Sequence, residues 1–477
     1  MYDLSLGCVA AAALLLLIQT ASAAPPAPPA PAPPLLSLQG RGGLLGDVTN
    51  GVATLVTDVL PSSISDVLDK LLGATPTTSP PTSGAELQSR LSSIWNQDNA
   101  SADFYGNVQR QIEANILPTN LLTAGSQALV APVAEEDSTS NVNPRSPSQT
   151  IYPKKDSTDA PYSAEEAQLR AAIHIPASFT YGEKQPVIFV PGTGTYGGEA
   201  FGSNLRKLLT GTDYADPVWL NVPGALLGDA QVNAEYVAYA INYVSGVSGG
   251  RNVSVISWSQ GGLDTQWAFT FWPSTRGVVS NFLPVSPDFH GTIFAYAICL
   301  SDPLQGPEGR PNFNPCDPSV IQQEYTSNLV SALRARGGAD AYVPTTSFYS
   351  GVYDEIVEPQ QGTGASAYIG DARGVGAANI EVQSVCPPTT PGGSFYGHAN
   401  MMAHPLTAAL VVDALTHAGP GDVSRIDLAR VCADYIAPGL TVFDAVATAG
   451  QIVNAATRLL AYQPKMTYEP SLMAYAA

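Results

Sequence analysis

The stretch VISWSQGGLDTQWAF, from Val255 to Phe269, changes from the pattern of a buried strand to that of a helix around Ser259. It predicts a strand, a sharp turn and a helix, with Ser259 at the turn. Gly261 provides one of the small residues that such a turn needs, and Ser257 stands where a glycine is usual. A turn of this kind raises the serine hydroxyl clear of the sheet, which is typical of a nucleophile. An ordinary serine in a strand-helix turn is the alternative.

Strand-like and helix-like segments alternate on both sides of this stretch, from about Ala164 to the C-terminus. This alternation predicts an α/β fold in which helices flank a mostly parallel central sheet. Catalytic groups in such folds lie on loops at the carboxyl ends of the strands. The predicted strands are Val187–Val190, Pro217–Asn221, Val253–Trp258, Asn281–Val285 and Thr345–Ser350, and the predicted helices include Ala230–Tyr243, Gln322–Arg336 and Leu406–Leu415.

A nucleophilic serine needs a base, and three histidines follow Ser259 in the appropriate part of the chain. His398 lies in FYGHANM, a segment rich in small residues, and His404 directly precedes a proline. His417 lies near the end of an apolar helix, where capping or interaction with the helix dipole is the better interpretation. The residues alone do not decide whether His398 or His404 is the base.

The base in turn needs an acid that orients it, and two places in the sequence offer one. Asp354 and Glu355 follow a β-rich run in FYSGVYDEIVEPQ, and Asp288 follows another in LPVSPDFHGT. Spacing alone does not choose between them.

The stretch VIFVPGTGTYGG, from Val187 to Gly198, has the G-x-G-x-x-G spacing of a dinucleotide-binding loop. That interpretation fails because Pro191 leads the loop, and because the next strand ends in Asn221 instead of an acidic residue. We therefore expect no nicotinamide cofactor. The glycines are better explained as residues that let this backbone approach the serine turn.

The chain has 477 residues, a formal net charge of −19 and 45% apolar residues. That apolar fraction is ample for a large core. The charge argues against nucleic acid and anionic membrane surfaces as partners, because like charges repel.

The N-terminus predicts secretion. The apolar run Gly7–Ile18 is too short to cross a bilayer, and Ala21-Ser22-Ala23 resembles a cleavage site, so residues 1–23 are interpreted as a signal peptide. No later segment has the apolar length of a membrane span.

Residues 24–155 form a proline-rich and helical N-terminal extension, whose polar last part ends in the dibasic pair Lys154-Lys155. The hypothesis is a propeptide that assists folding or covers the active site, and the alternative is a retained helical module. Residues 156–477 are assigned to the catalytic domain.

Loss of the signal peptide leaves four cysteines: Cys299, Cys316, Cys386 and Cys432. An even number in an oxidising compartment predicts two disulfides, and pairing of nearest neighbours is one of three possible connectivities. The cysteines lack the spacing of a zinc site, and we expect neither a metal nor a cofactor.

From about Leu169 onward, roughly two-thirds of the chain, the sequence resembles the fungal lipases related to Candida antarctica lipase B. The matching stretches are VPGTGTYG, DAQVNAEYVAYAI, WSQGG with QWAFTFWPS, PDFHGT, PTTSFYSGVYDEIVEPQ, VCPP with GHA, and EPSLMAYA. The resemblance implies an α/β-hydrolase fold and a carboxylic ester hydrolase that forms an acyl-enzyme.

The resemblance also implies roles for particular residues. Ser259 becomes the nucleophile, Asp354 the acid and His398 the base. Thr193 and Gln260 become the oxyanion-hole donors. Three further positions match residues of the substrate pocket: Trp258, Asp288 and Gln323.

The cysteines depart from the family pattern, because only Cys386 with Cys432 matches a family pair. Cys299 and Cys316 instead bracket a long polar insertion, for which we predict a disulfide-pinned loop near the pocket rim. The apolar run Leu440–Tyr462 predicts a helix. Burial in the core is the simpler interpretation of that helix, whereas the resemblance places it at the pocket entrance.

The preferred interpretation is a secreted, monomeric lipase or esterase that acts on ester or glyceride substrates, including substrates at a lipid interface. An acyltransferase or amidase with the same triad is one alternative. A non-catalytic secreted binding protein that keeps the fold is another. Asn99 and Asn252 lie in N-x-S sequons, and their glycosylation stays open.

Overall fold

The computed structural model describes residues 75–79, 81–95, 110, 113–116, 135–299, 315–351 and 353–477. Several sequence predictions lie outside these residues: the signal peptide, the early helices of the extension, the sequon at Asn99 and the insertion between Cys299 and Cys316.

A seven-stranded sheet forms the centre of the described fold, in the order β1-β3-β2-β4-β5-β6-β7. All neighbouring pairs are parallel except β1 with β3, so the predicted mostly parallel sheet is confirmed. The strands are β1 Ile173–His174, β2 Gln185–Val190, β3 Ala215–Leu220, β4 Val253–Trp258, β5 Val279–Val285, β6 Thr345–Tyr349 and β7 Ala377–Glu381. The five predicted strands correspond to β2 to β6.

Strands β1 and β7 were not among the predicted strands. β1 has two residues, and β7 has the sequence AANIE, of which only Ile380 is buried. A strand at the edge of a sheet needs no continuous apolar run, so neither segment carries a strong strand pattern.

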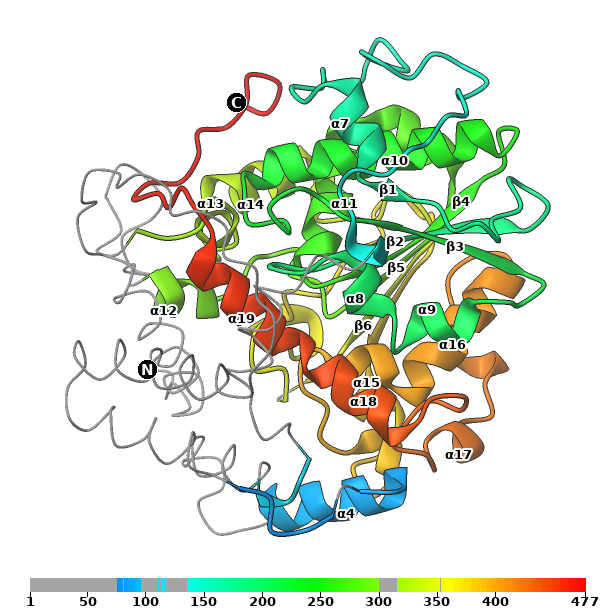
Figure 1. The fold of residues 1–477 in the computed structure, drawn as a ribbon, viewed down its shortest axis with the longest axis vertical. Coiled ribbons are helices and arrows are strands. Elements are labelled where there is room, and N and C mark those ends of the chain that lie inside the picture. Colours follow the sequence, from blue (N-terminus) through cyan, green and yellow to red (C-terminus); the bar gives the residue numbers. More distant parts are fainter. Residues whose placement is uncertain are drawn as a thin grey trace, which may run out of the picture.

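The sheet separates two hydrophobic cores because side chains alternate along each strand. In β2, Ile188 and Val190 join one core, whereas Val187 and Phe189 join the other. Helices α10 (Ala230–Val247) and α11 (Gln260–Phe271) cover the first face, and α8 (Gly197–Phe201), α9 (Leu205–Leu209) and α16 (Pro405–Thr416) cover the second (Figure 1). Both faces of the sheet are therefore buried, as predicted.

The predicted single helix Gln322–Arg336 is wrong, because the structure has two short helices there. Helix α13 (Pro318–Gln322) ends at Gln323, and α14 (Asn328–Leu333) begins after Ser327. The Ser327 side chain accepts a hydrogen bond from Val330 N and so caps the start of a new helix.

The remaining elements are short and lie mainly in the loops. The α-helices are α4 Gly84–Trp95, α7 Glu166–Ala171, α12 Phe294–Cys299, α15 Val382–Val385 and α17 Leu428–Val431. The 3-10 turns are η2 Glu135–Asp137, η3 Pro273–Val278, η5 Gly362–Gly364, η6 Pro391–Gly393, η7 Asn400–Ala403 and η8 Val423–Arg425, and a π turn, η4 Arg334–Gly338, follows α14.

The late apolar run forms two helices in place of one, α18 (Val442–Ala449) and α19 (Gln451–Ala461), which run one after the other across the front of the view (Figure 1). Gly450 lies between them. Helix α19 packs on the turn after β2, where a Cβ added to Gly194 would lie 2.8 Å from Ala455 Cα. This helix therefore lies directly over the segment that the sequence analysis connected with Ser259.

Both predicted disulfides are present, Cys299–Cys316 and Cys386–Cys432, so pairing of nearest neighbours is confirmed. Cys386–Cys432 joins the end of α15 to the end of α17. Cys316 exchanges two backbone hydrogen bonds of 2.7 Å with Met466, which ties the Cys299–Cys316 disulfide to the C-terminal segment.

Residues 135–155 lie against the part of the chain that follows them. The Asn141 side chain donates to Ala171 O at 2.9 Å, and Asn143 donates to Arg170 O and Ile173 O at 2.9 and 2.8 Å.

Among the helices that the structure describes, none has the length and apolar character that crossing a bilayer requires.

Candidate active site

Ser259 lies at the sharp turn between β4 and α11, as the sequence predicts. Its backbone has φ 55° and ψ −132°, a conformation that non-glycine residues rarely adopt and that is often found at functional sites. Helix α11 passes close to the loop after β2, as a Cβ added to Gly261 would lie 2.3 Å from Pro191 O. Only glycine fits there. Ser259 is 5% exposed.

His398 and Asp354 form a buried pair. His398 Nδ1 lies 3.0 Å from both carboxylate oxygens of Asp354. Asp354 Oδ1 also accepts hydrogen bonds from the backbone N–H groups of Ile356 and Val357, at 3.0 and 2.8 Å. These contacts fix the carboxylate and favour the imidazole tautomer that carries its proton on Nδ1. His398 Nε2 is buried and has no hydrogen-bond partner among the described residues, Ser259 included.

The backbone of His398 is anchored beside the serine turn. Trp258 Nε1 donates to His398 O at 3.3 Å, and Ser286 Oγ donates to the same oxygen at 3.1 Å. The Trp258 and His398 rings lie with their centroids 5.3 Å apart. Since Trp258 ends β4 directly before Ser259, the imidazole lies next to the turn.

The other two histidines have different surroundings. His404 is buried; its Nδ1 accepts from Leu406 N at 3.0 Å, and its Nε2 lies 2.8 Å from Gly392 O. Burial lowers the pKa of His404 to about 4, so the ring is neutral near pH 7. His417 caps the end of α16 through Asp413, as predicted. In the described structure neither histidine contacts Asp354 or Ser259.

Two further carboxyl groups lie near His398. Glu355 Oε2 accepts a hydrogen bond of 2.9 Å from His398 N. Both carboxylate oxygens of Asp288 are buried without a partner in the described part of the chain, and burial raises the pKa of Asp288 to about 7. Burial also raises the pKa of Glu355, and the neighbouring charge of Asp354 adds to this rise.

These carboxyl groups act on the titration of His398. Burial alone would lower the pKa of His398, but the charge and hydrogen bond of Asp354 outweigh burial, with smaller contributions from Glu355 and Asp288. The net result is a pKa raised above the ordinary histidine value.

Thr193, Gln260 and Gln323 form one hydrogen-bonded cluster. Thr193 Oγ1 lies 2.7 Å from Gln260 Oε1 and 3.2 Å from Gln323 Oε1. Gln323 Nε2 donates to Gln260 Oε1 at 3.0 Å, and Gln260 Nε2 donates to Leu226 O at 3.0 Å. Because the Leu226 carbonyl can only accept, the Gln260 amide is oriented with its oxygen toward Thr193.

Two backbone N–H groups near Ser259, those of Gln260 and Thr193, have no acceptor among the described residues. Gln260 is the first residue of α11, so its N–H has no acceptor within the helix. Gly194 N and Thr195 N donate to Ala225 O and Gly192 O, whereas the structure shows no acceptor for Thr193 N among the described residues. A Cβ added to Gly192 would lie 2.8 Å from Ser259 Cβ, so this loop touches the serine.

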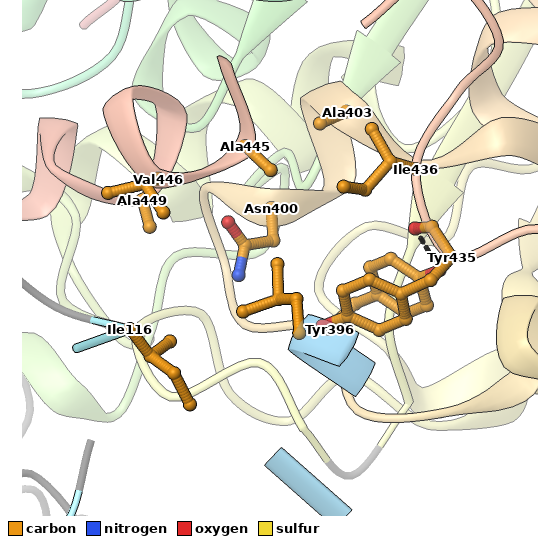
Figure 2. Close-up of a pocket in the computed structure, with 10 residues that line it drawn as sticks. Ile116, Tyr396, Asn400, Ala403, Tyr435, Ile436, Ala445, Val446 and Ala449 are labelled. Carbon is orange, nitrogen blue, oxygen red and sulfur yellow. Dashed lines mark hydrogen bonds between the residues drawn. The ribbon is translucent and has the colours of Figure 1, made fainter. Parts of the chain in front are cut away.

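A small apolar cavity of about 40 Å³ lies between the N-terminal extension and the later part of the chain (Figure 2). Ile116 of the extension lines it from one side, and Tyr396, Tyr435 and Ile436 line it from the catalytic domain. Asn400, two residues after His398, also borders the cavity, but Ser259, Asp354 and His398 do not.

The chain is similar in sequence to a known lipase. It is 34% identical to Lipase B of Pseudozyma antarctica over 322 residues, which are 67% of this chain and 87% of that protein. The chain belongs to the lipase B family. No model of a protein family matches it. Among solved structures, lipase B of Aspergillus fumigatus is 40% identical, with a TM-score of 0.76, and the match covers 91% of this chain and all of that one.

Membership of the lipase B family makes this protein an enzyme, a carboxylic ester hydrolase with the α/β-hydrolase fold. The candidate residues Ser259, Asp354, His398, Thr193 and Gln260 come together at the carboxyl ends of β2, β4 and β6. The contacts that Glu355 and Ser286 make with the His398 backbone were not predicted. The sequence pointed to Glu355 only because it follows Asp354 directly, and there it was considered only as another candidate for the orienting acid.

Proposed function

We propose that this lipase B family member hydrolyses esters through an acyl-enzyme on Ser259, with His398 as general base and Asp354 as the orienting acid. The arrangement of His398 carries the proposal. Its Nδ1 is held by Asp354, its Nε2 is free of other partners in the described structure, and its backbone is fastened beside the Ser259 turn.

The proton movements follow from this arrangement. His398 Nε2 accepts the proton of Ser259 Oγ as that oxygen attacks the ester carbonyl, and the imidazolium then donates it to the departing alcohol. In the second half, Nε2 accepts a proton from water as the water oxygen attacks the acyl carbonyl. The imidazolium then returns the proton to Ser259 Oγ as the bond from the acyl carbon to that oxygen breaks and the acid leaves. The hydrogen bond between Ser259 Oγ and His398 Nε2 forms when substrate binds, because catalytic hydrogen bonds commonly reach their working length only in the enzyme–substrate complex.

We propose that the oxyanion of the tetrahedral intermediate binds to the N–H groups of Thr193 and Gln260 and to the Thr193 hydroxyl. That hydroxyl lies against Gln260 Oε1 in the structure, and a rotation about χ1 turns it toward the oxyanion. The amino-terminal end of α11 adds a favourable dipole at the same place. Each donor of this kind contributes roughly 3 to 4 kcal/mol to catalysis.

The substrate proposal is a carboxylic ester or a glyceride, including one held at a lipid interface. Trp258, Asp288 and Gln323 then border the acyl and alcohol sides of the pocket. Secretion is also part of the proposal, and the two disulfides support it, because structural disulfides persist in oxidising compartments.

We infer that the N-terminal extension is a propeptide that covers part of the catalytic domain. Two apolar residues of the extension, Leu87 and Ile116, are 3% and 5% exposed and border the cavity formed with Ile436 (Figure 2). Residues 135–155, in contrast, are hydrogen-bonded to the catalytic domain. Cleavage before Glu135 would leave these bonds intact.

Reaction of the secreted protein with an organophosphonate ester tests these proposals together. We expect stoichiometric attachment to Ser259, found by peptide mass spectrometry, and an intact mass that places the mature N-terminus downstream of Ser79 and no later than Glu135. Failure to label Ser259 would favour a binding protein that keeps the fold. A mature chain that begins upstream of Ser79 would contradict the propeptide.

Replacement of Asp288 by asparagine is expected to shift the pH dependence of kcat/KM. General-base catalysis requires neutral His398, so kcat/KM should rise with pH through the pKa of that imidazole. The negative charge of Asp288 contributes to the raised pKa of His398. Asp288→Asn should therefore lower the pKa and shift the acid limb of the kcat/KM profile to lower pH. The exposed Asp422 offers a control, since Asp422→Asn also removes one charge but should leave the limb unchanged. A shift to higher pH in Asp288→Asn would contradict this account.

A further inference from the structure

The turn that carries Thr193 is held from outside by a side chain of α19. Arg458 Nη1 donates a hydrogen bond of 2.9 Å to the carbonyl oxygen of Gly194, the residue that follows Thr193. The guanidinium also lies over the Tyr196 ring, with 4.8 Å between Cζ and the ring centroid. Arg458 thus contacts the chain at two points within three residues of the oxyanion-hole donor.

A third contact runs to Glu199 in α8. Arg458 Nη1 is paired with Glu199 Oε1, and Arg458 Nη2 lies 3.0 Å from Glu199 Oε2. Glu199 Oε1 also accepts from Tyr196 N at 3.1 Å, so the carboxylate itself holds the turn. Both charged side chains are 16% exposed, and water therefore screens this pair less than it would screen a surface pair.

Other contacts also hold the turn, since Thr195 N and Thr195 Oγ1 donate to Gly192 O at 3.1 and 2.9 Å, but Arg458 is the partner of the Gly194 carbonyl among the described residues. Gly194 adopts φ +70°, and its N–H donates to Ala225 O at 2.8 Å. On the outer side it lies directly against the α19 backbone at Ala455. Glycine is required at this position by the positive φ and by the contact with the helix.

We propose that Arg458 is a positioning residue for the oxyanion hole, because it fixes the Gly194 carbonyl and thereby the orientation of the Thr193 N–H. This inference rests on the proposed role of Thr193. The bound carbonyl belongs to the peptide plane between Gly194 and Thr195, and the Thr193 N–H belongs to the plane between Gly192 and Thr193. The single plane between these two is held at its Gly194 N–H by Ala225 O, at 2.8 Å. Loss of the Arg458 contact frees rotation about ψ of Gly194, and the resulting shift of the turn reaches Thr193 and turns its N–H away from the oxyanion.

An arginine suits this place better than a lysine. The planar guanidinium binds one carbonyl and both carboxylate oxygens at once, and it also stacks on an aromatic ring. A lysine provides one charged nitrogen on a flexible stem, so it can replace part of these contacts but not their geometry. The residues involved are far apart in sequence, since Arg458 and Glu199 are separated by 259 positions.

The experiment compares Arg458→Met and Arg458→Lys with the unchanged enzyme on a soluble nitrophenyl ester. We expect Arg458→Met to lower kcat about 10- to 100-fold, because small misplacement of a catalytic donor has effects of this size, with KM changed less than about threefold. Arg458→Lys should give an intermediate kcat. Rates are divided by the concentration of active sites, which is determined by complete reaction with a phosphonate. Unfolded protein therefore does not affect kcat.

Arg425 offers a matched control, since it forms a two-point ion pair with the buried Asp413 away from the site. Arg425→Met should lower the thermal unfolding midpoint and leave kcat unchanged. An unchanged kcat in Arg458→Met, or an equal loss in Arg425→Met, would overturn the positioning role. Ser259→Ala separates the two proposals: if that variant retains activity the proposed function fails, whereas an inactive Ser259→Ala with a fully active Arg458→Met refutes the positioning role alone.

Discussion

Replacement Ser259→Ala is expected to lower kcat/KM for short-chain glyceride and nitrophenyl esters by about 10⁴- to 10⁶-fold. The change removes the oxygen that would form the acyl-enzyme and leaves the oxyanion donors in place. In free energy the loss corresponds to about 5 to 8 kcal/mol of transition-state stabilisation. Initial rates measured over a range of substrate concentrations, with the product acid titrated directly, test this expectation.

The same variant should keep its fold. The Ser259 N–H donates to Val285 O at 3.0 Å and the Ser259 carbonyl accepts from Gly262 N at 2.8 Å, and alanine retains both backbone hydrogen bonds. The strained φ of 55° stays equally unfavourable for alanine, so the thermal unfolding midpoint should change little. Ester hydrolysis at more than about one percent of the original rate in this variant would refute the assignment of Ser259.

Replacement His398→Ala is expected to lower kcat/KM by a similar factor, about 10⁴-fold or more, because no other base in the described structure is placed beside Ser259. His404→Ala should behave differently. It removes the side-chain contacts with Leu406 N and Gly392 O and leaves both groups buried, which costs about 2 to 4 kcal/mol of unfolding free energy. Its kcat/KM should stay within about threefold of the original.

Urea unfolding and ester kinetics on the two variants separate these effects. A catalytic defect in His404→Ala that equals the defect in His398→Ala would reassign the base. The control is informative because the two histidines are six positions apart, and both are buried.

The sequence could predict the local features of this fold because they depend on neighbouring residues. The change from strand to helix at Ser259 is encoded within fifteen residues, and five of the seven strands carry apolar runs. The disulfide pairs also agree with the simplest pairing of the cysteines. The break between α13 and α14 was missed because it depends on one capping residue, Ser327, in an otherwise helical pattern.

The site could be predicted only in part. From the residues alone two histidines stayed open as the base and two segments as the source of the acid, and the resemblance to lipases selected His398 and Asp354. The hydrogen bond between them joins positions 44 residues apart, which periodicity cannot reveal. The contact of Arg458 with Gly194 is hidden for the same reason. It depends on how α19 packs over the turn after β2, and no local pattern records that packing.

The hydrogen bonds of residues 135–155 set a practical limit on trimming this enzyme. Glu136 O accepts from Trp219 Nε1 at 2.7 Å and from Asn221 Nδ2 at 2.8 Å, both at the end of β3. Asp137 Oδ1 accepts from Glu199 N at 2.8 Å, on the residue that pairs with Arg458. A recombinant version that starts at residue 156 would strip acceptors from buried donors next to the oxyanion turn. An expression boundary at or before Glu135 keeps this short border of the catalytic unit, even if everything upstream is discarded.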